Sequence, residues 1–426
     1  MDVYAVTAVI LCALLAGMVS HRVQNTIFTL PMIFSGFGIL LGGLGLNLIQ
    51  LDLESEVIKI IAELTLVFVL STDASRIDVR RLRQDHTLPL RLLGIGLPLT
   101  MILGTVVALG MFPQLPFWEA AIIAIVLTPT DASLGMAVVT NPRVPVRIRQ
   151  SLNIESGLND GIAVPFLLLA ISFAALEAAG NHGYWIRFGL EQIVFGAVVG
   201  IVIGYLGTQW IDLGRKKRWM SLEFQKLSSL LIPILVYILA DFVGGNGFIA
   251  AFCSGVVVGN IRKWDEQDEL LHEFLEVPVH GLMMITFMIV FGAVMLPLAV
   301  DNVDGKIVLY AVLSLTVIRM LPVAISMLGA GVNSITVLFL GWFGPRGVAS
   351  ILYIFTVIET EGVLTKDSIY DLVLVTVLLS IILHGITAVP GANFYSKRLA
   401  QRIGNDGVEL TSVPEMPVRA HPKSLK

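Results

Sequence analysis

Three carboxylates stand in segments that are otherwise apolar enough to cross a membrane. Asp131 closes the run Thr128-Pro129-Thr130-Asp131, while Glu155 and Asp160 begin and end the run Glu155-Ser156-Gly157-Leu158-Asn159-Asp160. A carboxylate at the centre of a membrane helix costs roughly 2.5 to 3.5 kcal/mol on insertion scales, and such residues mark places where charge is used. The three acids therefore predict a water-accessible site that handles a cation or a proton.

Helical spacing indicates which polar residues of the second run share a face of the helix. Ser156 and Asp160 are four residues apart, and so are Glu155 and Asn159. Residues at this spacing lie on one face of a helix, one above the other. The two pairs therefore form adjacent stripes that can face one cavity.

The first run predicts a break in its helix. Pro129 removes a helical hydrogen bond and frees backbone carbonyls. We expect Asp131, Asp160, Ser156 and the carbonyl of Thr130 to form a cage made of oxygen atoms. Hard oxygen ligands suit an alkali cation such as Na⁺ or a proton, and no pair of His or Cys residues stands nearby to bind a transition metal.

Glu155 is expected to be neutralised rather than to carry the ion. A second acid beside an ion site is often held by an arginine, and Arg319 and Arg346 are the arginines that fall inside predicted spans. A guanidinium matches a carboxylate in geometry as well as in charge. We assign Glu155 to an ion pair, with Arg319 as the preferred partner and Arg346 as the alternative.

The composition places the chain in a lipid bilayer. Hydrophobic residues make up 56% and charged residues 14% of the chain, and the mean hydropathy is +0.84. Too little polar surface exists to cover a soluble globule. The net charge of −4 argues against a nucleic-acid partner. Cys12 and Cys253 lack metal-ligand spacing and are expected to serve packing.

Apolar runs of about 17 to 25 residues predict an all-α membrane protein with about thirteen transmembrane helices. Their centres lie near Ile10, Ile39, Leu66, Ile102, Val126, Val164, Val199, Leu235, Ala251, Ile289, Leu315, Ser350 and Leu379. Most of the 28 Lys and Arg residues fall in the loops after odd-numbered spans and in the tail. The loops after even-numbered spans hold only Arg187, Lys306 and Lys366. Because cytoplasmic loops are rich in Lys and Arg, the N-terminus is predicted outside and the C-terminus in the cytoplasm.

An odd number of spans with an outside start predicts two inverted repeats of six helices. The repeats cover about residues 3–176 and 227–390, and a linker helix at about 189–213 joins them. The transmembrane domain is then 1–392, and 393–426 form a short cytoplasmic tail.

Helices 5 and 12 are partners in these repeats, and both are expected to be broken. The first break is at 128–131 and the second at Gly341-Trp342-Phe343-Gly344-Pro345-Arg346-Gly347. Paired breaks in corresponding helices point to a binding site near the middle of the membrane. We expect the two broken helices to cross there.

These motifs resemble those of the monovalent cation:proton antiporters of the sodium/hydrogen exchanger branch, and of its NhaP-like prokaryotic members in particular. The run from Glu155 to Gly161 is similar to the ESxLNDG signature, and Leu127-Thr128-Pro129-Thr130-Asp131 is similar to the TPTD segment. Gly344-Pro345-Arg346-Gly347-Val348-Ala349-Ser350 resembles the RG-containing broken helix. The resemblance runs from about Ile33 to Ile386.

The resemblance implies a role for each site residue. Asp160 would carry the cation and the proton in turn, and Thr130, Asp131 and Ser156 would help to hold the cation. Glu155 would pair with Arg319. Asn159 stands where the electroneutral branch has its asparagine, which implies exchange of one cation for one proton.

The resemblance also implies how the protein is built and where it works. It implies a homodimer in the cell (inner) membrane, with a core bundle that moves against a dimerisation domain, and a role in sodium transport and pH homeostasis. It implies no cofactor beyond the transported ions. The segment Leu70-Ser71-Thr72-Asp73 departs from the pattern of many relatives, and Asp73 is expected to be a helix-end charge at the membrane interface.

Two other classes of function also use membrane acids. An intramembrane aspartyl protease needs two aspartates, but no GxGD-like motif is present. A gated cation channel needs a continuous pore ringed by carbonyls or acids. Paired broken helices around a titratable site favour exchange over both.

Overall fold

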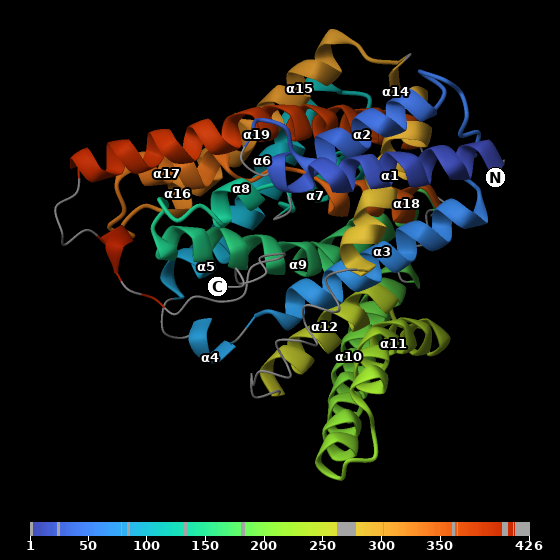
Figure 1. Ribbon diagram of the computed structural model, residues 1–426. Helices are drawn as coiled ribbons and strands as arrows, with labels where there is room; N and C mark the ends of the chain where they lie inside the picture. The colour runs from blue at the N-terminus through green and yellow to red at the C-terminus, as the bar shows by residue number, and fades with distance from the viewer. Residues whose placement is uncertain are drawn as a thin grey trace.

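The computed structural model describes residues 3–23, 26–77, 79–82, 86–131, 134–179, 184–261, 278–300, 302–359, 363, 365–402, 408–411 and 413. Every regular element within these residues is a helix, and the helices pack into one bundle (Figure 1). The predicted all-α membrane fold is thereby confirmed.

The first half of the chain carries the two motif-bearing segments. Its helices are α1 (Val3–Val23), α2 (Leu30–Leu41), α3 (Glu56–Ser75), α4 (Val79–Leu82), α5 (Thr87–Arg91), η1 (Leu92–Gly96), α6 (Leu97–Met111), α7 (Phe117–Val126), α8 (Met136–Val139), α9 (Val146–Ala179) and α10 (Tyr184–Lys216). The turns of η1 are wider than α-helical turns and join α5 to α6.

The second half repeats the mixture of long and interrupted helices. Its helices are α11 (Leu222–Phe242), α12 (Gly247–Ile261), η2 (Thr286–Met295), α14 (Leu296–Val300), α15 (Gly305–Leu315), α16 (Val317–Ser326), α17 (Ser334–Trp342), α18 (Val348–Glu359), α19 (Lys366–Arg402) and η3 (Val408–Leu410).

Eight helices among the described residues are long and apolar enough to cross a membrane, so the chain is a multi-pass membrane protein. Each of the thirteen predicted span centres lies within one of the helices given above. That all thirteen cross the membrane, and that they form inverted repeats, stays a prediction.

The structure extends two predicted segments. The helix predicted as a linker at about 189–213 is α10, which runs from Tyr184 to Lys216. The last helix continues to Arg402, beyond the boundary predicted at residue 392. The predicted tail 393–426 therefore begins inside α19, and most of its remainder, 403–407, 412 and 414–426, lies outside the described residues.

Helices α10 and α11 stand out from the bundle at the bottom of Figure 1. They carry many exposed large apolar side chains, among them Leu206, Trp210 and Ile238. An outward apolar surface of this kind is favourable in lipid and unfavourable in water. This surface is therefore suited to face the bilayer.

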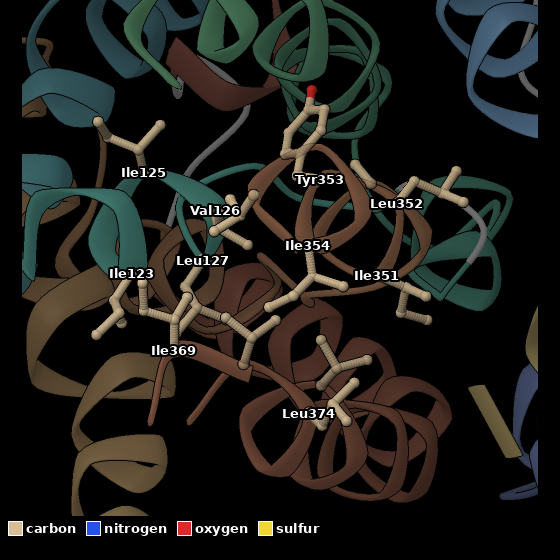
Figure 2. Packing of buried hydrophobic residues seen from close by; sticks show 14 of the residues in the cluster. Ile123, Ile125, Val126, Leu127, Ile351, Leu352, Tyr353, Ile354, Ile369 and Leu374 are labelled. Atoms are coloured by element: carbon tan, nitrogen blue, oxygen red, sulfur yellow. The ribbon is translucent and has the colours of Figure 1, made fainter. Parts of the chain in front are cut away.

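The largest apolar cluster holds the two short helices α7 and α18 in place. Figure 2 shows Val126 at the end of α7 facing α18, and Ile123 and Ile125 of α7 belong to the same buried cluster. Ile354 of α18 and Leu374 of α19 lie in the same buried cluster. Because protein interiors are close-packed, the ends of these short helices are fixed in position. Those ends form the site.

Candidate functional site

Two interrupted helices meet at the centre of the bundle. The α-helix α7 ends at Val126, and the backbone of 129–131 is not helical. Likewise α17 ends at Trp342, and 343–347 are not helical before α18 begins. The backbone N–H of Asp131 donates to the carbonyl oxygen of Pro345 at 2.8 Å. The predicted breaks are therefore present, and their backbones are joined.

Each break supplies a charge to the helix end of the other. Oδ2 of Asp131 accepts a hydrogen bond from the backbone N–H of Val348, the first residue of α18, at 2.9 Å. Nη1 of Arg346 donates to the carbonyl oxygens of Thr128 at 2.6 Å and Pro129 at 3.3 Å, just beyond the end of α7. An anion at a helix N-terminus and a cation beyond a C-terminus both complement the helix dipole. The two breaks therefore stabilise each other.

Glycine is required where the two breaks come closest. A Cβ placed on Gly347 would overlap the carboxylate of Asp131, and its distance to Cγ would be 2.7 Å. A Cβ on Gly344 would lie 2.5 Å from Nε of Arg319. Real Cβ atoms are not found this close to other heavy atoms, so these two positions admit only glycine without a shift of the site.

A cluster of side-chain oxygens joins α9 to the first break. The hydroxyls of Thr130 and Ser156 lie 2.9 Å apart. Nδ2 of Asn159 donates to Oγ1 of Thr130 at 2.7 Å. Asn159 is fully buried, and its Oδ1 has no hydrogen-bond partner in the described part of the chain. A buried acceptor of this kind is costly unless a ligand or water satisfies it.

Asp160 lies one turn after Ser156 on α9 and is 5% exposed. Its backbone carbonyl accepts a hydrogen bond from the hydroxyl of Tyr353 at 2.5 Å. Figure 2 shows this hydroxyl pointing away from the apolar cluster that α7, α18 and α19 form. Tyr353 therefore fixes the turn of α9 that carries Asp160 to α18.

Glu155 and Arg319 form a bidentate ion pair inside the bundle. Nη1 of Arg319 lies 2.6 Å from Oε1 of Glu155, and Nη2 donates to Oε2 at 2.8 Å. Both side chains are 1% exposed. This is the partner that the sequence favours, and Arg346, the alternative, uses its Nη1 on the carbonyls after α7.

The charges of this site do not sum to zero. Among the described residues that meet at this site, the buried carboxylates are Asp131, Glu155 and Asp160, and the buried guanidiniums are Arg319 and Arg346. When all five are ionised, one negative charge is in excess. A low-dielectric interior penalises such an excess strongly, so the site is suited to take up one positive charge.

A network of polar side chains on α19 supports the second break. The sequence favours a hydrogen-bonded packing role for His384, which the structure bears out, but it did not identify Ser380. The backbone N–H of Arg346 donates to Oγ of Ser380 at 2.6 Å. One ring nitrogen of His384 lies 3.0 Å from the carbonyl oxygen of Ser380, and the other lies 2.8 Å from that of Trp342. Ser380 stands four residues before His384 in an apolar helix, which is the sequence signal that could have indicated it.

Asp73 lies in the last turn of α3, as expected for a helix-end charge, and its position at the membrane interface stays a prediction. Its side chain is buried within the protein, and its Oδ1 lies 3.6 Å from Nη1 of Arg76. This end of α3 packs against α9, because a Cβ on Gly157 would lie 3.4 Å from Cδ1 of Ile77 and 3.6 Å from the carbonyl oxygen of Asp73. The end of α3 therefore lies beside the turn of α9 that begins the second motif.

At their opposite ends, α3 and α9 border a cavity. The cavity has a volume of about 430 Å³, and its walls include α10, α11 and α18. Polar side chains of its lining include Lys59, Glu63, Gln192 and Asn246. The same two helices are thus packed together near Gly157 and separated by a partly polar space further along α9.

Comparison with known proteins shows where this chain belongs. The sodium/hydrogen exchanger transmembrane family model matches residues 9–393. The chain is 25% identical over 414 residues to a K⁺/H⁺ antiporter NhaP of Alkalimonas amylolytica, with 95% of this chain and 69% of that protein covered. It is 28% identical over 312 residues to a Na⁺/H⁺ antiporter of Schizosaccharomyces pombe, with 66% of this chain and 65% of that protein covered. It spans only 35% of a second, probable Na⁺/H⁺ antiporter of the same organism.

The fold is also found among solved structures. The sodium proton antiporter MjNhaP1 from Methanocaldococcus jannaschii, determined at pH 8, superposes with a TM-score of 0.72 at 17% identity. The match covers 93% of this chain and 97% of that structure. The helix arrangement is therefore the one found in this antiporter. Because the family model matches nearly the whole transmembrane region, the chain belongs to the sodium/hydrogen exchanger family.

Proposed function

We propose that this protein exchanges a monovalent cation for a proton across the membrane, with both ions competing for Asp160. The charge excess of the site carries the proposal, since three buried carboxylates face two buried guanidiniums. One proton or one monovalent cation neutralises this excess. Sodium is the expected cation, and the relatives of this chain include both Na⁺/H⁺ and K⁺/H⁺ antiporters.

The chemistry of Asp160 makes the exchange obligatory. An ionised carboxylate without a counter-ion is strongly disfavoured in a low-dielectric surrounding. Asp160 can therefore pass from one face of the membrane to the other when it is protonated or bound to a cation, and not when it is bare. After Asp160 has released a cation on one side, it must therefore bind a proton before it returns, and after it has released a proton it must bind a cation.

The oxygen atoms around Asp160 are suited to hold a dehydrated alkali cation. In this proposal the hydroxyls of Thr130 and Ser156 and the carboxylates of Asp131 and Asp160 are its ligands. The first two lie 2.9 Å apart. Asn159 donates to Thr130 and so orients a lone pair of that hydroxyl. A hard cation prefers such a set of oxygen ligands.

Glu155 and Asn159 limit the exchange to one charge. Glu155 is paired with Arg319 through two short contacts, and in this proposal the pair stays together throughout the cycle. Asn159 has no charge to lose. With Asp160 as the one group that changes its ligand, the cation-loaded and the proton-loaded carriers have equal charge, and transport is electroneutral.

The packing of α3 and α9 supports alternating access. In this proposal water enters through the cavity of about 430 Å³ beside the later part of α9, and the packing of the end of α3 near Gly157 closes the other side. With the N-terminus outside, the cavity opens outward. We propose that movement of the core helices against the remainder of the bundle closes the cavity and opens the other side, and that the protein works as a homodimer in the cell membrane.

Transport by purified protein in liposomes tests this proposal. Liposomes with a pH-sensitive dye inside are exposed to outward or inward gradients of Na⁺, K⁺ and Li⁺ in turn. We expect each accepted cation to drive a proton flux in the opposite direction. Protein-dependent cation movement without any proton movement would contradict the proposal.

A further inference from the structure

A short segment after α19 is attached to the end of the bundle at which α9 and α17 begin. The turn η3, in the red segment at the left of Figure 1, lies beside the first turn of α9. Nη1 of Arg147 donates to the carbonyl oxygen of Val408 at 2.8 Å. The segment is thereby bound to the helix that carries Glu155 and Asp160.

Glu409 binds the same segment to α17. It is 1% exposed, and its Oε1 accepts hydrogen bonds from the backbone N–H of Asn333 at 2.6 Å and the hydroxyl of Thr336 at 3.0 Å. Asn333 is the residue that caps α17, and its own side chain accepts from Ile335. A carboxylate at a helix N-terminus is favoured by the helix dipole and by the unpaired N–H groups there.

Helix α17, to which the segment is bound, is itself attached to α19. The hydroxyl of Tyr395 lies 3.0 Å from that of Thr336, and the Tyr395 ring stacks on Phe339 with 4.0 Å between the ring centres. At the other end of α17, Nε1 of Trp342 donates to Thr387 of α19 at 2.9 Å. Helix α17 is thus attached to α19 along its length, and η3 connects this pair to α9.

We propose that residues 408–411 form a clamp that positions α17 against α9, and that Glu409 is a positioning residue for the cation site. The site depends on two separate helices, because its ligands Ser156 and Asp160 lie on α9, while Arg346, which binds the carbonyls before the ligands Thr130 and Asp131, follows α17. A shift of α17 along α9 would move Arg346 away from the carbonyls of Thr128 and Pro129. The clamp opposes such a shift at the end of α17 that lies farther from the break.

A pair of shortened chains isolates the clamp. One chain ends after residue 413 and keeps Val408–Leu410, and the other ends after residue 407 and lacks them. The substitution Glu409→Ala removes both hydrogen bonds that Glu409 accepts. Glu409→Gln removes the charge alone, because a glutamine retains one acceptor oxygen. The chain that ends after residue 413 is the control for truncation itself.

Hydrogen exchange of the whole protein in detergent gives a readout that does not depend on transport. We expect amides 333–337 to exchange about fivefold to tenfold faster in Glu409→Ala and in the chain that ends after residue 407. Amides 351–357 of α18 should be unchanged. The control chain should match the full chain, and Glu409→Gln should lie closer to the full chain than Glu409→Ala does.

A transport measurement extends the test, and its interpretation rests on the proposed function. The Na⁺ concentration for half-maximal proton flux should rise about threefold or more in Glu409→Ala, with a smaller change in the maximal rate, since misplaced ligands weaken binding. Unchanged exchange at 333–337 in both clamp variants, or an unchanged half-maximal concentration, would overturn the clamp. Absence of flux in the full chain would instead contradict the proposed function, and hydrogen exchange would still decide the clamp.

Discussion

Asp131 binds the first residue of a helix that lies 217 positions further along the chain: its Oδ2 accepts from the N–H of Val348 at 2.9 Å. Arg346 makes the reverse contact with the carbonyl oxygen of Thr128. Each broken helix thus supplies the charge that the other one needs. A substitution in one break is therefore expected to be felt in the other.

Asparagine and alanine at position 131 should separate the two roles of Asp131. Asp131→Asn keeps an acceptor for Val348, so the melting temperature in detergent should change little, while the Na⁺ concentration for half-maximal flux should rise. Asp131→Ala removes the cap and should cost about 0.5 to 2 kcal/mol of stability as well. An unchanged half-maximal concentration in Asp131→Asn would show that Asp131 is structural only.

Gly347→Ala should damage the contact between the breaks. The added methyl group would overlap the carboxylate of Asp131. Overpacking of this kind costs about 1 to 3 kcal/mol, so both the melting temperature and the cation affinity should fall. Gly110→Ala in α6 is the matched control, because a Cβ there meets no atom within 4 Å. Equal behaviour of the two variants would show that the two breaks are not this close in the membrane.

The Glu155–Arg319 pair should be strongly coupled. Glu155→Gln or Arg319→Gln alone leaves one buried charge without its partner, a loss of about 3 to 5 kcal/mol. The double variant should lose less than the sum of the two single variants in thermal unfolding. The pair Arg187 and Glu191 has the same 2.6 Å separation but side chains that are 81% and 42% exposed, so its removal should show little coupling. Additive losses for Glu155 and Arg319 would contradict the pairing.

The positions of the breaks and of the acids could be read from the sequence. Pro129 and the run from Gly344 to Gly347 interrupt apolar helices, and the two adjacent stripes on α9 follow from spacing alone. Arg319 could be named as a partner of Glu155 because few arginines lie in apolar segments. Each of these predictions rests on one strong local rule about charge or backbone in lipid.

Long-range contacts could not be read in the same way. Nothing in the local pattern of Tyr353 or Ser380 indicates that they bind the backbone of Asp160 and Arg346. The helix-end position of Asp73 could be predicted, but its burial depends on the packing of the end of α3 beside α9, which the local sequence does not specify. The burial of Glu409 depends on how the chain returns after α19, which composition does not specify.

Transport should be electroneutral and should have a bell-shaped dependence on pH. At low pH excess protons keep the cation from Asp160, and at high pH too few protons remain for exchange. An imposed membrane potential should leave the rate unchanged, since one charge enters for each charge that leaves. A sustained transport current on a solid-supported membrane would show that a second group titrates, with Asp131 as the first candidate.

The most direct test of the account is cation-driven proton flux in liposomes that contain the Asp160→Asn variant. Asparagine is nearly the same size as aspartate, but it can neither titrate nor neutralise a cation. Asp371→Asn is the control, because Asp371 is also a buried aspartate but lies away from the site. It stands nine residues, about 13 Å along α19, before Ser380, the residue that binds the second break. The account predicts that Asp160→Asn is folded, as judged by gel filtration and melting temperature, yet shows no flux, while Asp371→Asn retains flux. Substantial Na⁺-driven proton flux in Asp160→Asn would contradict the assignment of Asp160 as the carrier.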